Sequence, residues 1–152
     1  MFRSWATDVN SNRTTTALAP GATDSSHPAW AIGSGMANTI AIQAQTGNVA
    51  ASSAAVYAYE YSNNGKSDWH LPSIFELNEM CKYARDTGQP AGRDFVCSGG
   101  SSAFNRGFSN FGYWSSTEYT GNTALLQDFM SNSVMANFSK GVTDRVRPVR
   151  AF

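Results

Sequence analysis

The stretch GYWSSTEY, residues 112–119, constrains the fold more than any other part of this sequence. In a β-strand successive side chains alternate between two faces, so Tyr113 and Trp114 point in opposite directions and the hydroxyl residues are divided between them. Neither face is purely apolar, and buried hydroxyl groups require hydrogen-bond partners. The stretch therefore predicts a strand in a small, loop-rich domain with a polar core rather than in a plain sandwich.

The best-defined helix lies within residues 68–88. Ser73 and Glu76 form a capping box, in which each side chain bonds to the backbone N–H of the other residue. Pro72 prevents the helix from extending backwards. Apolar residues then recur on one helical face, namely Ile74, Leu77, Met80, Cys81 and Ala84.

Two shorter, Ala-rich helices are predicted upstream, within residues 35–47 and 48–65. In each of them an asparagine is placed to cap the N-terminus and a glycine to end the helix. These residues are Asn38 and Gly47 for the first helix, and Asn48 and Gly65 for the second. Before them, residues 2–9 alternate enough for a strand, and residues 10–28 have the composition of an exposed loop.

Four strand-like segments close the chain, and short turns separate them. The strands cover residues 113–119, 124–130, 134–139 and 145–152. Pro148 cannot donate a hydrogen bond, so its strand is an edge strand or turns the missing N–H outward. Together with the helices these segments predict an α+β fold with two to three helices and a twisted antiparallel sheet that ends in a β-meander.

Size and charge limit the function classes. With 152 residues we expect one compact domain. The formal net charge is zero, which argues against a general nucleic-acid binder. No segment approaches the roughly 20 apolar residues that a membrane helix needs, so we expect no membrane insertion. The chain can be a fragment, a mature product or the C-terminal module of a longer protein. A homo-oligomer and a fusion to a longer stalk are also open alternatives.

The two cysteines, Cys81 and Cys97, lie sixteen residues apart in sequence. In an oxidising compartment we expect them to form a disulfide that holds down the long Gly/Ser-rich connection of residues 87–111. The alternative is a pair of free thiols in a reducing compartment. The two histidines, His27 and His70, are far apart and no zinc-ligand spacing is present, so we expect no metal site and no cofactor.

Basic residues concentrate near the C-terminus. The last thirteen residues contain one acidic residue, Asp144, and four basic residues, namely Lys140, Arg145, Arg147 and Arg150. One interpretation is an anion-binding strip. The other is an ordinary set of solvated strand ends.

Three segments resemble one known family in the same order and at similar spacing. They are SDWHLPSIFEL at residues 67–77, GYWSSTEY at 112–119 and VRPVRAF at 146–152, with AIGSGMANTIAI at 31–42 as a weaker fourth. The chain resembles the Lcl C-terminal domain family over residues 31–152, with residues 1–30 as an N-terminal strand and exposed loop. The resemblance implies a C-type-lectin-like fold, in which Trp114 packs on the helix that begins in the first of these segments.

The resemblance also implies an extracellular, cell-surface or virion-surface location and a role in recognition. The calcium-site tripeptides of sugar-binding C-type lectins and the C-terminal cysteines of the oxygenase relatives have no counterpart here. The first hypothesis is therefore an adhesin-type module that binds a surface polysaccharide, such as a sulfated glycan. Its basic candidates are Arg106, Lys140, Arg145, Arg147 and Arg150.

Two other hypotheses are open. A protein-binding or structural tip module, such as a phage receptor-binding domain, would use the Tyr- and Asn-rich meander and would bind a cell-surface protein. Its candidates among the ligand-binding residues are Tyr113, Tyr119 and Asn122. An enzyme is the third hypothesis, with His70 beside Asp68 as the tempting pair. We do not expect an enzyme, because no nucleophile elbow, phosphate loop or metal spacing is present.

Overall fold

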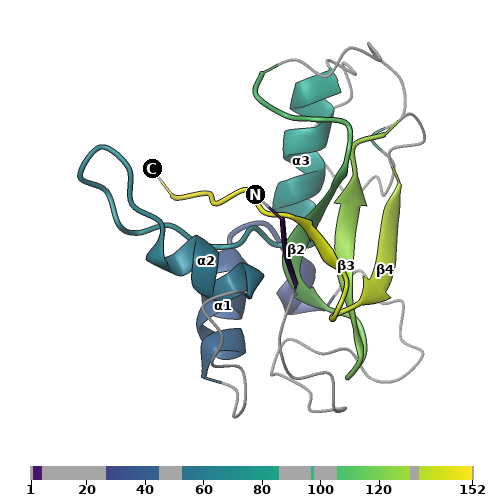
Figure 1. Cartoon of the computed structure of the whole chain (residues 1–152), viewed down its shortest axis with the longest axis horizontal. Helices are drawn as coiled ribbons and strands as arrows, with labels where there is room; N and C mark the ends of the chain where they lie inside the picture. Colours follow the sequence, from purple (N-terminus) through teal and green to yellow (C-terminus); the bar gives the residue numbers. More distant parts are fainter. Residues whose placement is uncertain are drawn as a thin grey trace.

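The computed structural model describes residues 2–4, 27–44, 53–85, 97, 106–130 and 134–151. Its helices are the 3₁₀ helix η1 (Pro28–Trp30) and the α-helices α1 (Gly35–Gln43), α2 (Ala54–Glu60) and α3 (Ile74–Arg85). Its strands are β1 (Phe2–Ser4), β2 (Gly112–Glu118), β3 (Thr123–Asp128), β4 (Met135–Ser139) and β5 (Thr143–Arg145). Helices α1 and α2 lie together on one side of the sheet and α3 stands beside β2 (Figure 1). The predicted α+β class is confirmed, and the three α-helices agree with the predicted two to three.

The five strands form one sheet in the order β1-β5-β2-β3-β4. The predicted meander is confirmed for β2, β3 and β4, which pair antiparallel in that order. It is wrong for the last strand, because β5 crosses to the other side of β2 and pairs with it in parallel, with Tyr113 opposite Arg145. The sheet is therefore mixed rather than antiparallel. The crossing brings Val146, just after β5, into the core with Trp114, whereas β4 is largely exposed.

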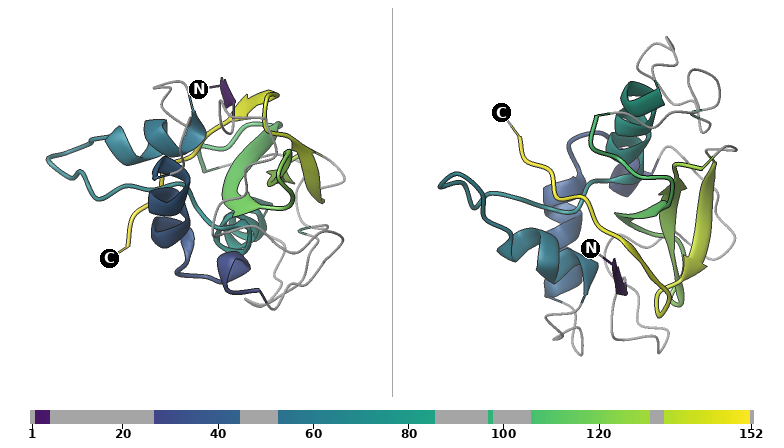
Figure 2. Two further views of the ribbon diagram at one scale, coloured as in Figure 1. Left: turned by 90° about the horizontal axis from the view of Figure 1, so that it is seen from below. Right: turned by 45° about the horizontal axis from the view of Figure 1, so that its top comes forward.

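The chain beyond β5 continues as an extended segment towards α2, as Figures 1 and 2 show. The predicted strand of residues 145–152 is therefore short, since β5 ends at Arg145. A two-way backbone bridge joins the extension to the segment before α3: His70 N donates to Val149 O at 2.8 Å, and Val149 N donates to His70 O at 2.9 Å. Of the predicted strand at residues 2–9, β1 covers Phe2–Ser4, and residues 5–9 lie outside the described part.

Three predicted helix boundaries are wrong: both N-terminal ends and the C-terminal end of the second helix. Helix α1 begins after Ser34, and Asn38 is a buried interior residue whose Nδ2 donates to Ala29 O at 2.8 Å and to Ser116 Oγ at 3.2 Å. Helix α2 begins after Ser53, whose hydroxyl caps it, and ends at Glu60. The predicted caps Gly47 and Asn48 lie outside the described residues.

Gly65 does not end a helix but forms a hairpin. Asn64 and Gly65 both have positive φ, 51° and 72°, as a type I′ turn requires. The flanking residues Asn63 and Lys66 form the bridge that closes the turn. The Asn-Gly pair is a hairpin signal, and the helical periodicity upstream of it concealed that signal.

The capping box and the disulfide are confirmed. Ser73 Oγ accepts Glu76 N at 3.2 Å, and Glu76 Oε2 accepts Ser73 N at 2.7 Å. Cys81 of α3 is bonded to Cys97. Both sulfurs are buried in a cluster that also contains Tyr113 of β2 and the ring of Phe129, which follows β3. The disulfide thus joins the long connection after α3 to the core.

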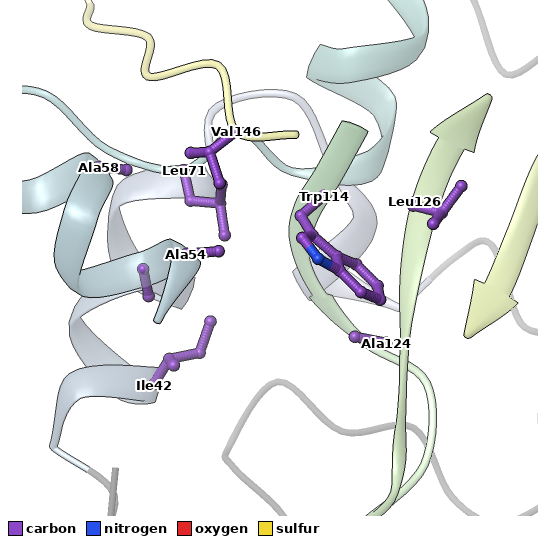
Figure 3. Packing of buried hydrophobic residues seen from close by; sticks show 9 residues of the cluster. Ile42, Ala54, Ala58, Leu71, Trp114, Ala124, Leu126 and Val146 are labelled. Atoms are coloured by element: carbon purple, nitrogen blue, oxygen red, sulfur yellow. The ribbon is translucent and has the colours of Figure 1, made fainter. Parts of the chain in front are cut away.

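Strand β2 is buried along its whole length. Figure 3 shows the cluster around Trp114, which includes Ile42 of α1, Leu71 and Val146 together with alanines of α2. Trp114 therefore packs in the cluster of α1 and α2, and the expectation that it packs on α3 is wrong. The alternation explains this, because Tyr113 is the β2 aromatic that shares a cluster with α3.

The last residue of β2, Glu118, forms an ion pair with the ammonium of Lys140, and both side chains are fully buried. Lys140 follows β4, and its backbone N–H donates to Asn122 O at 3.0 Å. A buried charge is costly unless it is paired. The pair therefore holds the turn that sends the chain from β4 across to β5.

Removing one partner should be far worse than removing both. We expect Lys140→Met to lower the free energy of unfolding by about 3–5 kcal/mol, because it removes the ammonium that compensates the buried Glu118 carboxylate. The double variant Glu118→Leu/Lys140→Met should recover most of that loss. Urea unfolding of the three proteins measures both quantities. A loss below about 1 kcal/mol for the single variant would contradict the account.

Candidate functional site

The eight candidate ligand residues fall into groups at different places in the fold. Tyr119, Asn122 and Lys140 lie at the end of the sheet where β2 passes into β3 and β4 leaves it. Tyr113, Arg106, Arg145 and Arg147 lie at the opposite end of β2, and Arg150 lies on the C-terminal extension. No single site can therefore contain all eight side chains.

Three arginines form what we call the arginine row: Arg106, Arg145 and Arg147. Each guanidinium lies over an aromatic ring. The distances from guanidinium carbon to ring centroid are 4.1 Å for Arg106 over Tyr83, 4.1 Å for Arg145 over Phe111 and 4.8 Å for Arg147 over Phe108. Cation–π contacts of this kind hold a charge in place without neutralising it.

The segment of residues 106–111 assembles the arginine row. Arg147 Nη1 donates to Gly107 O at 3.2 Å, and Arg145 Nη1 donates to Ser109 Oγ at 3.3 Å. Gly107 has a φ of +83°, and a Cβ there would lie 3.3 Å from Arg147 Nη2. Glycine thus allows both the left-handed turn and the close approach of the guanidinium.

Two of the other candidates have structural partners. Lys140 is fully buried against Glu118, so its charge does not reach solvent. Tyr113 is 4% exposed, and its hydroxyl accepts Ser109 N at 3.0 Å, which positions the segment that carries the arginine row. Tyr119 is half-buried and Asn122 is exposed, both away from that row.

Arg150 is held by an acid rather than by an aromatic ring. Its Nε and Nη2 donate to the two carboxylate oxygens of Asp68, both at 2.8 Å. This bidentate contact lowers the pKa of Asp68 and raises that of Arg150. Both side chains remain partly exposed, at 26% for Arg150 and 52% for Asp68. The enzyme hypothesis paired His70 with Asp68, but the Asp68 carboxylate is bound by Arg150.

Beside Arg150 lies a groove of about 1020 Å³, which the sequence analysis did not identify. One wall is the end of α2 with the hairpin and Trp69, and the other is the C-terminal extension from Val146 to Ala151. The start of α3 and the turn before α1 close it. In Figures 1 and 2 the extension and the hairpin beyond α2 lie on the same side of the molecule. The Asn-Gly turn followed by Trp69 was the sequence signal for one wall, but nothing in the sequence indicated the other.

Glu76 organises the floor of this groove. Besides capping α3, its Oε1 accepts Gly33 N at 2.7 Å, and its Oε2 lies 3.9 Å from Nε2 of His70. Burial lowers the pKa of His70, and the nearby Glu76 carboxylate and Asp68 backbone oppose that shift without reversing it. His70 is therefore neutral in the folded protein at neutral pH.

The buried histidine predicts a specific pH dependence of stability. Because the folded-state pKa lies below the ordinary 6.5, the unfolded chain binds a proton first as the pH falls. Stability is complete above that value and should decline as the pH falls from about 6.5 towards the folded pKa. Thermal unfolding of the wild type and His70→Gln between about pH 8 and pH 5 tests this, since carboxyl groups titrate mainly below that range. Parallel curves for the two proteins would contradict it.

Gly35 makes this packing of the floor possible. A Cβ at Gly35 would meet the Glu76 carboxylate, His70 Cδ2 at 2.8 Å and Leu71 O at 2.9 Å. The first residue of α1 therefore has to be glycine for steric reasons, although its φ is not in the left-handed region.

Substitution of this glycine should reverse the usual preference of helices. Alanine in place of glycine normally stabilises a helix by up to about 1 kcal/mol. We expect Gly35→Ala instead to destabilise the protein by about 1–3 kcal/mol, because it overpacks the floor. The exposed Ala37→Gly in the same helix is the control, with a loss of about 1 kcal/mol from propensity alone. Chemical denaturation measures both, and a Gly35→Ala variant as stable as the wild type would refute the steric account.

Fold and site together define a small α+β domain that carries aromatic-stacked arginines beside a groove. The family model of the Lcl C-terminal domain matches residues 4–150. The chain belongs to that family, as its three motifs predicted. Comparison with curated proteins and with solved structures gave no match. No helix in the described part of the chain is long and apolar enough to cross a membrane.

Proposed function

We propose that this chain is an extracellular, non-catalytic adhesion module that binds a sulfated polysaccharide through the arginine row. Membership of the Lcl C-terminal domain family supports an adhesin-like role. We also propose that its fold belongs to the C-type-lectin-like class.

The observation that carries the proposal is the pre-organisation of three guanidinium groups around one short segment, residues 106–111. Arg106 and Arg147 are exposed, and each guanidinium lies over an aromatic ring, Tyr83 for Arg106 and Phe108 for Arg147. A guanidinium held in this way loses little conformational entropy when its N–H groups bind an anion. Sulfate oxygens accept the paired hydrogen bonds that the planar fork donates.

A chain with no net charge can still bind a polyanion where its charge is locally concentrated. One acid, Asp144, lies next to Arg145 in the row. Arg106 and Arg147 are therefore the stronger members of the site, and Arg145 is the weaker one.

A second candidate function is protein binding or self-assembly through the edge strand β4. Large apolar side chains are exposed on and around that strand: Met130 at 45%, Val134 at 40%, Phe138 at 45% and Val142 at 43%. Exposed apolar patches of this kind are typical of protein interfaces. Tyr119 and Asn122 lie at one end of this part of the sheet.

Retention on immobilised heparin tests the main proposal. We expect salt-sensitive retention that falls steeply between low and about 0.15 M ionic strength, because the contact is between charges. The variant Arg106→Ala/Arg147→Ala should lose most of it. Lys66→Ala/Arg150→Ala removes the same number of positive charges outside the row and should retain more.

The control separates a specific site from net charge. Equal losses in the two double variants would mean that heparin responds to overall charge and would contradict the arginine row. If the wild type is not retained even at low salt, the polysaccharide proposal fails. Concentration-dependent self-association that Phe138→Ser abolishes would then favour the interface on β4.

A further inference from the structure

We propose that the groove between Trp69 and the C-terminal extension is a second binding site, which accepts an uncharged sugar ring of an oligosaccharide. This site adjoins the arginine row, because Arg147 borders both, but it differs from the row in chemistry. It binds a hydroxyl-rich neutral ligand, whereas the arginine row binds anions.

Aromatic rings form a corner in the wall of the groove. Trp69 and Tyr61 meet edge to face, with ring centroids 5.1 Å apart and an interplanar angle of 85°. Both residues are half-buried, so part of each ring faces the groove. Trp69 Nε1 donates to Lys66 O at 3.0 Å, which fixes the indole against the hairpin. A rigid aromatic surface packs well against the apolar C–H face of a sugar ring, because it offers contact area at low entropic cost.

Charged groups of both signs surround this corner. The cationic lining residues are Lys66, Arg147 and Arg150, and the lining carboxylates are Glu76 and Glu79. Arg150 is paired with Asp68 and Glu79 is paired with Lys82, so these ion pairs already compensate much of the charge. Carboxylates only accept hydrogen bonds and guanidinium groups only donate them, whereas a sugar hydroxyl does both. A neutral polyol therefore satisfies such a rim, and the carboxylates would repel a sulfate or phosphate.

The groove is built to stay open. The hairpin turn at Asn64 and Gly65 is closed by its own bridge, and the two-way bridge between His70 and Val149 ties the two walls together. The volume of about 1020 Å³ lies at the upper end of ordinary small-molecule sites, so it has room for more than one ring. An extended peptide could not add to the chain at this bridge, because the N–H and C=O groups of His70 and Val149 already bond to each other.

Chemical-shift mapping on the wild-type protein tests the proposal directly. The probes are cellohexaose, laminarihexaose, mannohexaose and chitohexaose, each added up to about 10 mM, which detects Kd values into the millimolar range. We expect at least one to give saturable shifts of the backbone amides of residues 61–71 and 149–151. Those shifts should not change between about 0.15 M and 1 M salt, because the hexasaccharides carry no charge.

Matched variants locate the contact. Trp69→Ala and Tyr61→Ala should each weaken binding of that sugar by about tenfold. Tyr59→Ala is the control, because Tyr59 lies at the end of α2 two residues before Tyr61, is 45% exposed and does not line the groove, so it should leave the affinity within about twofold. Wild-type mapping gives a result even if an aromatic variant fails to fold.

Two outcomes would overturn the proposal. One is the absence of shifts with all four hexasaccharides, and the other is saturable shifts that lie wholly outside residues 61–71 and 149–151. The tests with neutral sugars and with heparin can fail independently of each other. Loss of heparin retention with intact hexasaccharide binding would leave the groove standing, and the reverse result would leave the arginine row standing.

Discussion

The hydroxyl groups of β2 are the constraint on which the rest of the structure depends. Ser116 Oγ donates to Pro72 O at 3.1 Å, and Thr117 Oγ1 donates to Ala29 O at 3.0 Å while it accepts Ile74 N, also at 3.0 Å. One polar strand thus satisfies the backbone of η1 and of the segment that enters α3. Such groups are costly to bury without partners, so these loops have to lie against β2. Asn38 completes the network by joining α1 to Ser116.

Because β2 is used on both faces, the molecule has two halves that meet at that strand. Trp114 belongs to the cluster with α1 and α2, and Tyr113 to the cluster with the disulfide and α3. The last strand, β5, has to run beside β2 and not beside β4 to supply Val146 to the first of these clusters. This crossing carries the C-terminal arginines past the segment of residues 106–111 and then along the groove. Both proposed ligand sites are therefore consequences of the path that the chain takes after β4.

Local chemistry made part of this predictable. The capping box of Ser73 and Glu76 and the helix that follows depend on neighbours in sequence, and the order of β2, β3 and β4 depends on short turns. The crossing of β5 could not be predicted in this way, because its cause is a distant core cluster and a buried ion pair at Lys140. For the same reason the basic residues could be named as candidates but not sorted. Burial of Lys140, pairing of Arg150 and stacking of Arg147 all depend on contacts from elsewhere in the chain.

The central claim is that guanidinium groups of the arginine row bind sulfate directly. The most direct measurement is NMR observation of the arginine Nε–Hε signals during titration with a heparin-derived hexasaccharide. Arg85, which is 4% exposed and donates to Met130 O at 2.8 Å, is an internal reference in the same spectrum. The account predicts that the signals of Arg106 and Arg147 move as the site saturates while that of Arg85 stays in place. Saturable binding that leaves the signals of Arg106 and Arg147 unchanged would contradict it.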